Sequence, residues 1–317
     1  MVCLGGGHGL FQTLRAARSM GAEDISAVVT VADDGGSSGR IRRELGQIPP
    51  GDLRMAIAAL ADNSPHGSLW EEVLQHRFGG HGALAGHAVG NLLISGLIEV
   101  TGDPVASLAE VARLAHSRGT ILPVVPEPLD IEADVAGLDA DPRVVRQVRG
   151  QVAVASTPGQ VRRVRLLPER PSATPEVIQA IGGAELVTLG PGSWFTSVIP
   201  HLLVPEVVAA ISATQALRVV VLNLTAEPGE TQGFSAERHI HMLSQHAPDV
   251  RVDVVLVDSS ALLSESEKTH LWRAAQRIGA DIEYRPLRHT DAAGRATDLH
   301  DPQKLAQALS GLYAARS

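Results

Sequence analysis

The chain has 317 residues, 44% of them hydrophobic, and a formal net charge of −8. This length and composition allow a substantial buried core and argue against a disordered chain. The negative charge and the lack of a basic tract argue against nucleic acid as a partner, because a general nucleic-acid binder needs a cationic surface for phosphate. The single cysteine, Cys3, excludes a disulfide framework and a cysteine-built metal site. The sequence shows neither a secretory signal nor an apolar run of membrane-spanning length, so we expect a cytoplasmic protein without membrane insertion.

Five apolar runs along the chain end in small, polar or acidic residues. In chain order the junctions read VCL-GGGHG, AVVTV-ADDGGSSG, ELVTL-GPGS, RVVVLNL-TAEPGET and VDVVLV-DSS. Helical stretches separate most of these runs, which is typical of a parallel sheet buried on both faces. We therefore predict an α/β protein with a Rossmann-like, mostly parallel sheet flanked by helices. The polar loops would then share the sheet edge at which such folds bind ligands.

The first polar loop, residues 5–9, connects a strand to the predicted helix 9–20. Glycines there let backbone N–H groups and the positive end of the helix approach an anion without an intervening side chain. The predicted phosphate-binding residues of this loop are Gly5, Gly6, Gly7, His8 and Gly9. A tight turn without a ligand is the alternative interpretation. Leu10 occupies the position of the third glycine in a dinucleotide fingerprint, so we expect neither NAD nor a permanently bound flavin.

Asp33 and Asp34 follow the second apolar run. Two carboxylates at a strand end can bind a divalent metal ion, accept hydrogen bonds from ribose hydroxyls or act as a general base. Beside a diphosphate the expected cation is Mg²⁺, with Asp33 and Asp34 as its predicted ligands. The alternative is a turn in which a carboxylate accepts from its own backbone. We expect one of the two side chains to cap the turn and the other to face the ligand.

The next part of the chain is predicted to be helical, at 51–62 with Asp52 in the first turn, at 87–100 and at 104–117. The small residues at 35–42 leave space for a ligand, and GHAVGNLLI places a histidine and an asparagine four residues apart on one helix face. The further cleft candidates are Ser37, Ser38, Arg40, Arg54, His87 and Asn91.

Residues 120–168 differ from the rest of the chain. Apolar and polar residues alternate there, as in LDIEADVAG and QVRRVRLLP, which favours short, half-exposed antiparallel strands. We interpret this stretch as a β-rich insertion or sheet extension within a single domain that spans 1–317; a linker is the alternative. The α/β pattern resumes at 173 and ends in a predicted helix at 301–315.

A second glycine loop, GPGS, follows the third apolar run. Gly190 and Gly192 allow close backbone approach, while Ser193 and Thr196 supply hydroxyl groups near the start of a helix. Simple helix capping by Ser193 is the alternative. Two such loops on one sheet edge favour a diphosphate or a nucleotide sugar that lies across the cleft.

Six motifs occur along the chain in the order GGGHG, VTVADDGGSSGR, PPGDLR, GHAVGNLLI, GPGSWFTSVIPHLLV and EPGETQGF. Together they resemble the CofD-like superfamily, and within it the YvcK or gluconeogenesis factor family, over most of the chain. The resemblance implies that the two glycine loops hold phosphate and that the Asp33–Asp34 pair corresponds to the metal-binding strand end of a related transferase. It also implies that Asn223, Glu230 and Thr231 belong to the site.

The resemblance further implies a function. YvcK-type proteins bind UDP-sugars and support cell shape and peptidoglycan synthesis during growth on gluconeogenic carbon sources. We therefore expect a bacterial, cytosolic regulator that binds UDP-N-acetylglucosamine or UDP-glucose without obligatory turnover. Its expected partners are an unidentified protein of cell-wall synthesis and further copies of itself in a homo-oligomer. For such a regulator, the ligand should order the loop at 35–42 or the loop at 227–234.

Two other functions compete with this expectation. The enzyme branch of the superfamily implies a Mg²⁺-dependent 2-phospho-L-lactate transferase, which joins a phospholactyl group to a deazaflavin. A nicotinamide oxidoreductase is the third hypothesis, and the missing third glycine argues against it.

Overall fold

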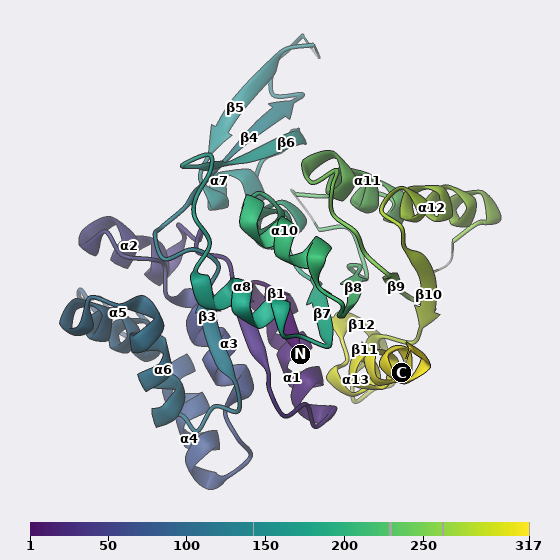
Figure 1. Cartoon of the computed structure of the whole chain (residues 1–317). Coiled ribbons are helices and arrows are strands. Elements are labelled where there is room, and N and C mark those ends of the chain that lie inside the picture. Colours follow the sequence, from purple (N-terminus) through teal and green to yellow (C-terminus); the bar gives the residue numbers. More distant parts are fainter. Residues whose placement is uncertain (142, 228–229, 262, 317) are drawn as a thin grey trace.

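A computed structural model describes residues 1–141, 143–227, 230–261 and 263–316. Its centre is a seven-stranded parallel sheet with the strand order β10–β9–β8–β7–β1–β2–β3 (Figure 1). The strands are β1 (Val2–Gly5), β2 (Ser26–Val29), β3 (Thr120–Pro123), β7 (Leu186–Leu189), β8 (Leu217–Val221), β9 (Val254–Asp258) and β10 (Asp281–Arg285). The predicted α/β fold class is confirmed.

Helices cover both faces of this sheet. On one face α1 packs between α3 and α13, and on the other α10 contacts α8 and α9 while α11 contacts α12. Figure 1 shows α8 and α10 in front of the sheet and α1 and α3 behind it. The helices are α1 (Gly7–Ser19), α2 (Gly36–Leu45), α3 (Gly51–Leu60), α4 (Pro65–Gln75), α5 (Val89–Thr101), α6 (Pro104–Leu114), α7 (Gln151–Ala155), α8 (Pro175–Gly182), the π-helical turn η1 (Trp194–Val198), α9 (Ile199–Leu202), α10 (Pro205–Ala213), α11 (Ala236–His246), α12 (Glu265–Arg277) and α13 (Pro302–Arg316).

Strand β1 lies where the order of the chain through the sheet reverses. Strands β2 and β3 follow on one side of it, whereas β7, β8, β9 and β10 follow on the other. The loops after β1 and β7 therefore leave neighbouring strands at the centre of the carboxyl edge. This switch point is where open α/β sheets place their ligands.

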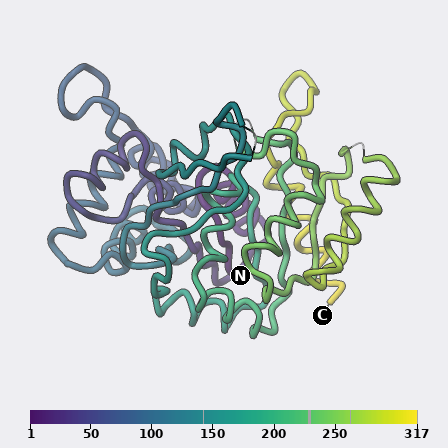
Figure 2. The backbone as a smooth tube through the Cα atoms, turned by 90° about the horizontal axis from the view of Figure 1, so that it is seen from above, coloured from purple at the N-terminus to yellow at the C-terminus, as the bar shows by residue number. Residues whose placement is uncertain are grey.

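A separate antiparallel sheet has the order β5–β4–β6 and is built from β4 (Asp130–Ala136), β5 (Val145–Arg149) and β6 (Gln160–Leu167). It is the predicted β insertion, with two corrections. Thr120–Pro123 pairs in parallel with β2 and is the edge strand of the main sheet. Residues 151–155 form helix α7 instead of a strand, after a glycine with φ of 103°. Figure 2 shows this sheet, in teal, between the purple N-terminal and yellow C-terminal parts.

Two helices lie where the sequence pattern predicts none. Helix α2 occupies the segment 35–42 that was expected to be a loop, and a side-chain carbon at Gly39 would overlap the carbonyl group of Asp34. Tertiary packing thus overrides the low helix propensity of a glycine-rich segment. Helix α4 is capped by Ser64, whose hydroxyl accepts from the Gly67 N–H, and a proline occupies the first helical position. The remaining short hairpin consists of β11 (Arg288–Thr290) and β12 (Ala296–His300).

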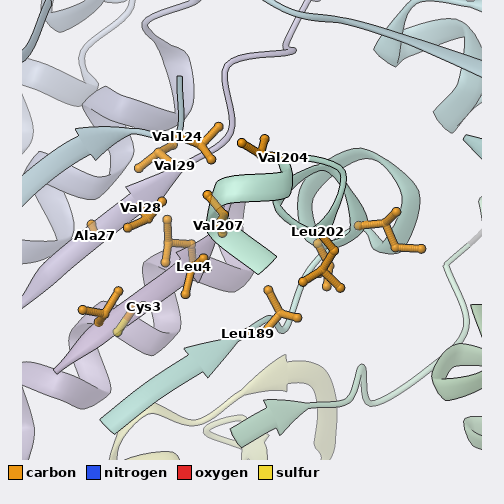
Figure 3. Close-up of a cluster of buried hydrophobic side chains, with 14 of the residues drawn as sticks. Cys3, Leu4, Ala27, Val28, Val29, Val124, Leu189, Leu202, Val204 and Val207 are labelled. Carbon is orange, nitrogen blue, oxygen red and sulfur yellow. The ribbon is translucent and has the colours of Figure 1, made fainter. Parts of the chain in front are cut away.

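The core consists mainly of leucine, valine and isoleucine side chains from the central strands and the helices that cover them. Figure 3 shows Leu4, Val28 and Leu189 of three strands together with Leu202 and Val207. Cys3 is fully buried beside them, and burial raises the pKa of its thiol to about 11, so it stays protonated at neutral pH. Because the central strands β1, β2 and β7 are almost entirely buried, their polar neighbours lie in the loops at the strand ends.

No single helix in the described ranges is both long and apolar enough to cross a membrane. One pair of helical segments, Trp194–Leu202 and Pro205–Ala213, meets the requirement by length and composition only, and it is bent by 72° at the break. Every residue of its first segment is buried.

Candidate functional site

The loops after β1 and β7 contact each other at the switch point. A side-chain carbon at Gly9 would overlap the carbonyl group of Pro191 and lie 2.8 Å from the Cα of Gly192, so only glycine permits this approach. The two loops border a cavity of about 280 Å³. Its lining residues are Gly6, Gly7, His8, Gly9, Thr30, Asp33, Asp52, Gln151, Ser193, Thr196, Ser197 and Glu227. The two loops predicted to bind phosphate thus open into one cavity, which we call the glycine cavity.

The first turn of α1 faces the glycine cavity. Gly7 has a φ of 55°, and the helix begins without a side-chain cap. The N–H groups of His8 and Gly9 have no acceptor within the helix and can therefore meet an anion. The buried side chain of His201 bonds the start of this loop, because its Nε2 donates to the Gly5 carbonyl at 3.1 Å. Burial lowers the pKa of His201 to about 4, so its ring is neutral at pH 7.

Carboxylates dominate the charge of the glycine cavity. Burial, followed by the negative charge of Asp33, raises the pKa of Asp52 to about 7, although the Gly7 N–H donates to that carboxylate. Burial also raises the pKa of Glu227. Among the described lining residues there is neither a lysine nor an arginine. A diphosphate in this cavity would therefore need a cation between its oxygens and the carboxylates.

The two neighbouring aspartates of the sequence have different surroundings. Asp33 lines the glycine cavity, and its Oδ1 also accepts from the Gly35 N–H at 2.9 Å. Asp34 does not line the cavity, because its Oδ1 accepts from the Val152 N–H at the start of α7, at 2.9 Å. We expected one aspartate to cap the turn and the other to face the ligand, but Asp33 does both: it caps the turn at Gly35 and lines the cavity. The described residues hold no group of three or more His, Cys, Asp and Glu side chains suited to a metal ion.

Asp52 is the second carboxylate of the cavity, and sequence reasoning missed this role. The residue was expected only as a favourable charge in the first turn of a helix, which it also is. Its position depends on the glycine loop, since a side-chain carbon at Gly6 would lie 2.6 Å from its Oδ2. The signal in the sequence was the motif PPGDLR, which contains this aspartate.

The GPGS loop is held in place by residues that do not line the glycine cavity. The side-chain amide of Asn223 accepts from the Gly192 N–H and donates to the Gly192 carbonyl, both at 3.0 Å. Ser193, Thr196 and Ser197 remain directed at the cavity. The structure therefore places Asn223 behind the loop, as a positioning residue.

Glu230 and Thr231 also lie outside the lining of the glycine cavity. Glu230 is buried and accepts from the Phe195 N–H at 3.1 Å, and burial raises the pKa of its carboxyl to about 7. The hydroxyl of Thr231 accepts from the Glu227 N–H at 2.8 Å. Part of the loop predicted at 227–234, namely 228–229, lies outside the described residues.

Four of the six further candidates form a hydrogen-bonded network, while Arg40 donates to the Ala85 carbonyl at 2.8 Å. The Nε of Arg54 donates to Asn91 at 2.9 Å, Asn91 donates to the Ser37 hydroxyl at 3.0 Å, and that hydroxyl lies 2.9 Å from Nδ1 of His87. Burial lowers the pKa of Arg54 to about 10 and also lowers that of His87. This network joins α2, α3 and the start of α5. None of the six further candidates lines the glycine cavity; they are Ser37, Ser38, Arg40, Arg54, His87 and Asn91.

A second cavity, of about 250 Å³, lies outside the carboxyl ends of β8 and β9. Asn223, which bonds the GPGS loop, lines this second cavity, so the second cavity adjoins that loop. Phe234 and the buried His239 form part of its wall, and sequence reasoning missed both. The Nδ1 of His239 lies 2.9 Å from the Ser235 carbonyl and must donate to it. Burial lowers the pKa of His239, so the ring is neutral and its Nε2, which has no partner in the described structure, is an acceptor.

A parallel sheet with two contacting glycine loops at its switch point defines a protein of the Rossmann-like α/β class. Comparison with known families makes the assignment more specific. The family profile described as 2-phospho-L-lactate transferase CofD matches residues 1–297. A Mycobacterium tuberculosis protein, provisionally named a gluconeogenesis factor, is similar to this chain. The two are 58% identical over 314 residues, which are 99% of this chain and 90% of that protein.

Two Bacillus relatives agree with this match. The gluconeogenesis factor of Bacillus subtilis is 37% identical over 279 residues, which are 88% of this chain and 84% of that protein. The solved structure of a UPF0052 family member from Bacillus halodurans is similar with a TM-score of 0.83 at 31% identity, over 98% of this chain and 97% of that one. The chain therefore belongs to the CofD family, and within it to the gluconeogenesis factor, or YvcK, group.

Proposed function

We propose that the protein binds a nucleotide sugar of the UDP-N-acetylglucosamine or UDP-glucose type and acts as a regulator without obligatory turnover. The contact between the two glycine loops carries this proposal. It brings the free N–H groups of the α1 N-terminus and the hydroxyl groups of the second loop to one cavity at the switch point. A diphosphate is the ligand group that such an arrangement of donors fits.

The nucleoside would occupy the second cavity. Phe234 offers an aromatic surface there, and the neutral ring of His239 offers an acceptor to an N–H group of a base. Asn223 lies between the two cavities and fixes the loop that separates them. A nucleotide sugar would then lie along the carboxyl edge of the sheet, with its diphosphate in one cavity and its nucleoside in the other.

Asp33 and Asp52 fit a Mg²⁺ ion that would accompany the diphosphate. Mg²⁺ prefers oxygen ligands and is commonly held by one or two carboxylates together with phosphate oxygens and water. The raised pKa of Asp52 supports this assignment, because a cation would replace the proton that otherwise limits its repulsion with Asp33. The cation would supply the positive charge that the described lining residues lack.

The gluconeogenesis factor name of the relatives supports a regulatory role. We propose that the liganded state is recognised by a protein of cell-wall synthesis and maintains cell shape during growth on gluconeogenic carbon sources. A homo-oligomer in the cytoplasm is part of the same proposal.

A Mg²⁺-dependent 2-phospho-L-lactate transferase is the second candidate. The match to the CofD profile supports it, and so does the pKa of Asp52 near 7, because a general base works best when its pKa is close to the working pH. The test is incubation with the activated phospholactyl donor, a deazaflavin acceptor and Mg²⁺, followed by chromatography. A new phospholactyl–deazaflavin product establishes the enzyme. Its absence, with nucleotide-sugar binding intact, supports the regulator.

Calorimetry with UDP-N-acetylglucosamine and Mg²⁺ tests the main proposal. We expect binding by the full chain and a loss of about 100-fold in affinity for Gly9→Ala, equivalent to about 3 kcal/mol, because the added methyl group pushes the two loops apart. Gly96→Ala is the matched control, since Gly96 lies in α5 with open space around it. Equal affinity in both variants, or no binding at millimolar ligand, would overturn the proposal.

A further inference from the structure

A groove of about 860 Å³ lies at the opposite edge of the main sheet from the glycine cavity. It is bordered by the C-terminal half of α1, by the segments that precede β2 and β3, and by the start of α13. Three guanidinium groups line this arginine groove, those of Arg15, Arg18 and Arg118. On a chain with a net charge of −8, such a concentration of cations calls for a physical explanation.

The three arginines differ in how their charges are compensated. Arg15 forms an ion pair with Glu71. Arg18 has neutral acceptors, the Ala59 carbonyl at 2.9 Å and the Asn63 side-chain oxygen at 2.6 Å. Burial, and after it the positive charges of Arg15 and Arg118, lower the pKa of Arg18, while the nearby carboxylates of Glu71 and Asp62 act in the opposite direction. The guanidinium of Arg18 is therefore held near other cations without a carboxylate bonded to it.

Arg118 is exposed at the groove and makes no side-chain hydrogen bond or ion pair with any residue of the described ranges. Its charge adds to the repulsion felt by Arg18. Two carboxylates line the groove. Glu23 is exposed, and Asp301 is engaged as the acceptor for the N–H groups of Gln303 and Lys304, at 2.9 and 3.1 Å.

A structural role explains Arg18 in part, because it ties the C-terminal ends of α1 and α3 together and favours both helix dipoles. The same role does not explain the guanidinium of Arg118, because only the backbone N–H of this residue donates a hydrogen bond, to the Leu60 carbonyl, and its charge acts on Asp62 without an ion pair. The two guanidinium groups repel each other across a hollow surface, and a dianion between them would relieve this repulsion.

The remaining lining indicates what else the ligand carries. The side-chain amide of Gln12, the amide nitrogen of Asn63 and the amide oxygen of Gln303 supply donors and acceptors suited to hydroxyl groups, whereas the Asn63 oxygen and the Gln303 nitrogen already bond Arg18 and Ser19. Phe11 and Ile25 supply apolar surface, and the Arg15 guanidinium lies 5.3 Å from the centre of the Phe11 ring. A small hydroxylated carbon skeleton fits such a mixture better than a bare inorganic ion does.

We propose that the arginine groove binds a phosphorylated sugar or polyol, with the phosphate between Arg18 and Arg118 and the hydroxyl groups against the amides. This site is independent of the nucleotide-sugar proposal. Helix α1 turns its first residues to the glycine cavity and its last turn to the arginine groove, so the two sites lie at opposite ends of one helix.

Calorimetry and two-dimensional NMR of the full chain test the proposal with four probes: inorganic phosphate, glucose 6-phosphate, fructose 6-phosphate and ribose 5-phosphate. We expect at least one sugar phosphate to bind about tenfold more tightly than inorganic phosphate, with shifts at the groove residues. Arg118→Ala should weaken that binding about tenfold, and Arg118→Lys should restore part of it, because a cation without the planar fork remains.

Two control variants separate the possible outcomes. Arg113→Ala removes an equal charge from an exposed position outside the groove and should leave the affinity unchanged. Gly9→Ala should also leave it unchanged, which distinguishes this site from the glycine cavity. Failure of all four probes to bind, equal affinity for phosphate and every sugar phosphate, or insensitivity to Arg118→Ala would each overturn the proposal.

Discussion

The glycine cavity and the arginine groove lie at opposite ends of α1 and present opposite charges to a phosphate. The glycine cavity is lined by Asp33, Asp52 and Glu227 and, in the described structure, by no lysine or arginine, whereas the groove is lined by three arginines. The difference shows two physical ways to hold the same group. At the carboxyl edge of the sheet, backbone N–H groups and a metal ion would bind it; at the amino edge, guanidinium groups would.

The largest effect in this comparison is expected from the metal ligands of the glycine cavity. With Mg²⁺ present, Asp33→Asn should reduce the affinity for UDP-N-acetylglucosamine about 100-fold, because one of two carboxylate ligands is lost. Asp34→Asn is the matched control next to it in the sequence. Its amide oxygen can still accept from the Val152 N–H, so we expect little change. Calorimetry with and without EDTA measures both.

Two results would contradict the assignment of Asp33. A larger loss of affinity in Asp34→Asn than in Asp33→Asn would indicate that Asp34, which bonds the start of α7, is the metal ligand instead. A loss in Asp33→Asn that persists in EDTA would indicate a structural effect through the Gly35 N–H instead. Neither variant should alter sugar-phosphate binding in the arginine groove, since α1 separates the two sites.

The glycine loops could be predicted from the sequence because their requirement is local. A strand that ends in closely spaced glycines before a helix carries the same signal in any chain, and the structure places both loops at one cavity. The fold class could be predicted for the same reason, since apolar runs and helical stretches alternate along the chain. Helix α2 could not, because the packing of Gly39 against Asp34 depends on tertiary contacts.

The parts of the site that were missed depend on contacts between distant segments. Asp52 reaches the cavity only because α3 packs against the loop after β1, and its pKa near 7 arises from burial and from Asp33. Asn223 has the residue type of a ligand contact, yet both ends of its amide bond the Gly192 backbone. The arginine groove has no contiguous motif at all, since its residues come from separate segments of the chain.

The pH dependence of metal binding is the next largest effect. Because Asp52 has a pKa of about 7, Mg²⁺ must displace its proton below that pH, and the apparent affinity for Mg²⁺ should rise about tenfold per pH unit up to pH 7 and level off above it. Protonation of Asp52 also contributes to the stability of the ligand-free fold. This contribution is complete below the ordinary aspartate pKa of 3.8 and is lost as the pH rises through the raised pKa of about 7.

Titration of Mg²⁺ at a series of pH values, followed by calorimetry with UDP-N-acetylglucosamine, measures this slope. Asp52→Asn carries no titratable proton at that position and should show a flat profile between pH 5 and 7. A wild-type profile that is equally flat would mean that Asp52 is not a ligand of the cation. Sugar-phosphate binding in the arginine groove should be flat between pH 7 and 8, above the second ionisation of a phosphate monoester.

The smallest expected effect, a difference in salt dependence, compares the two sites most directly. Arg118 is exposed, and at about 0.15 M salt the screening length is only about 8 Å, so its attraction for phosphate should weaken about threefold to tenfold when potassium chloride is raised from low to high concentration. In the glycine cavity the ligand would contact buried backbone N–H groups and a coordinated cation, which salt screens much less. We expect less than about a twofold change there over the same range. Removing the exposed charge in Arg118→Ala should reduce the salt slope of sugar-phosphate binding, whereas Arg118→Lys should keep it. Equal salt slopes at the two sites would contradict this comparison. They would mean that the same kind of contact holds the anion in both sites, although the linings of the two sites carry opposite charges.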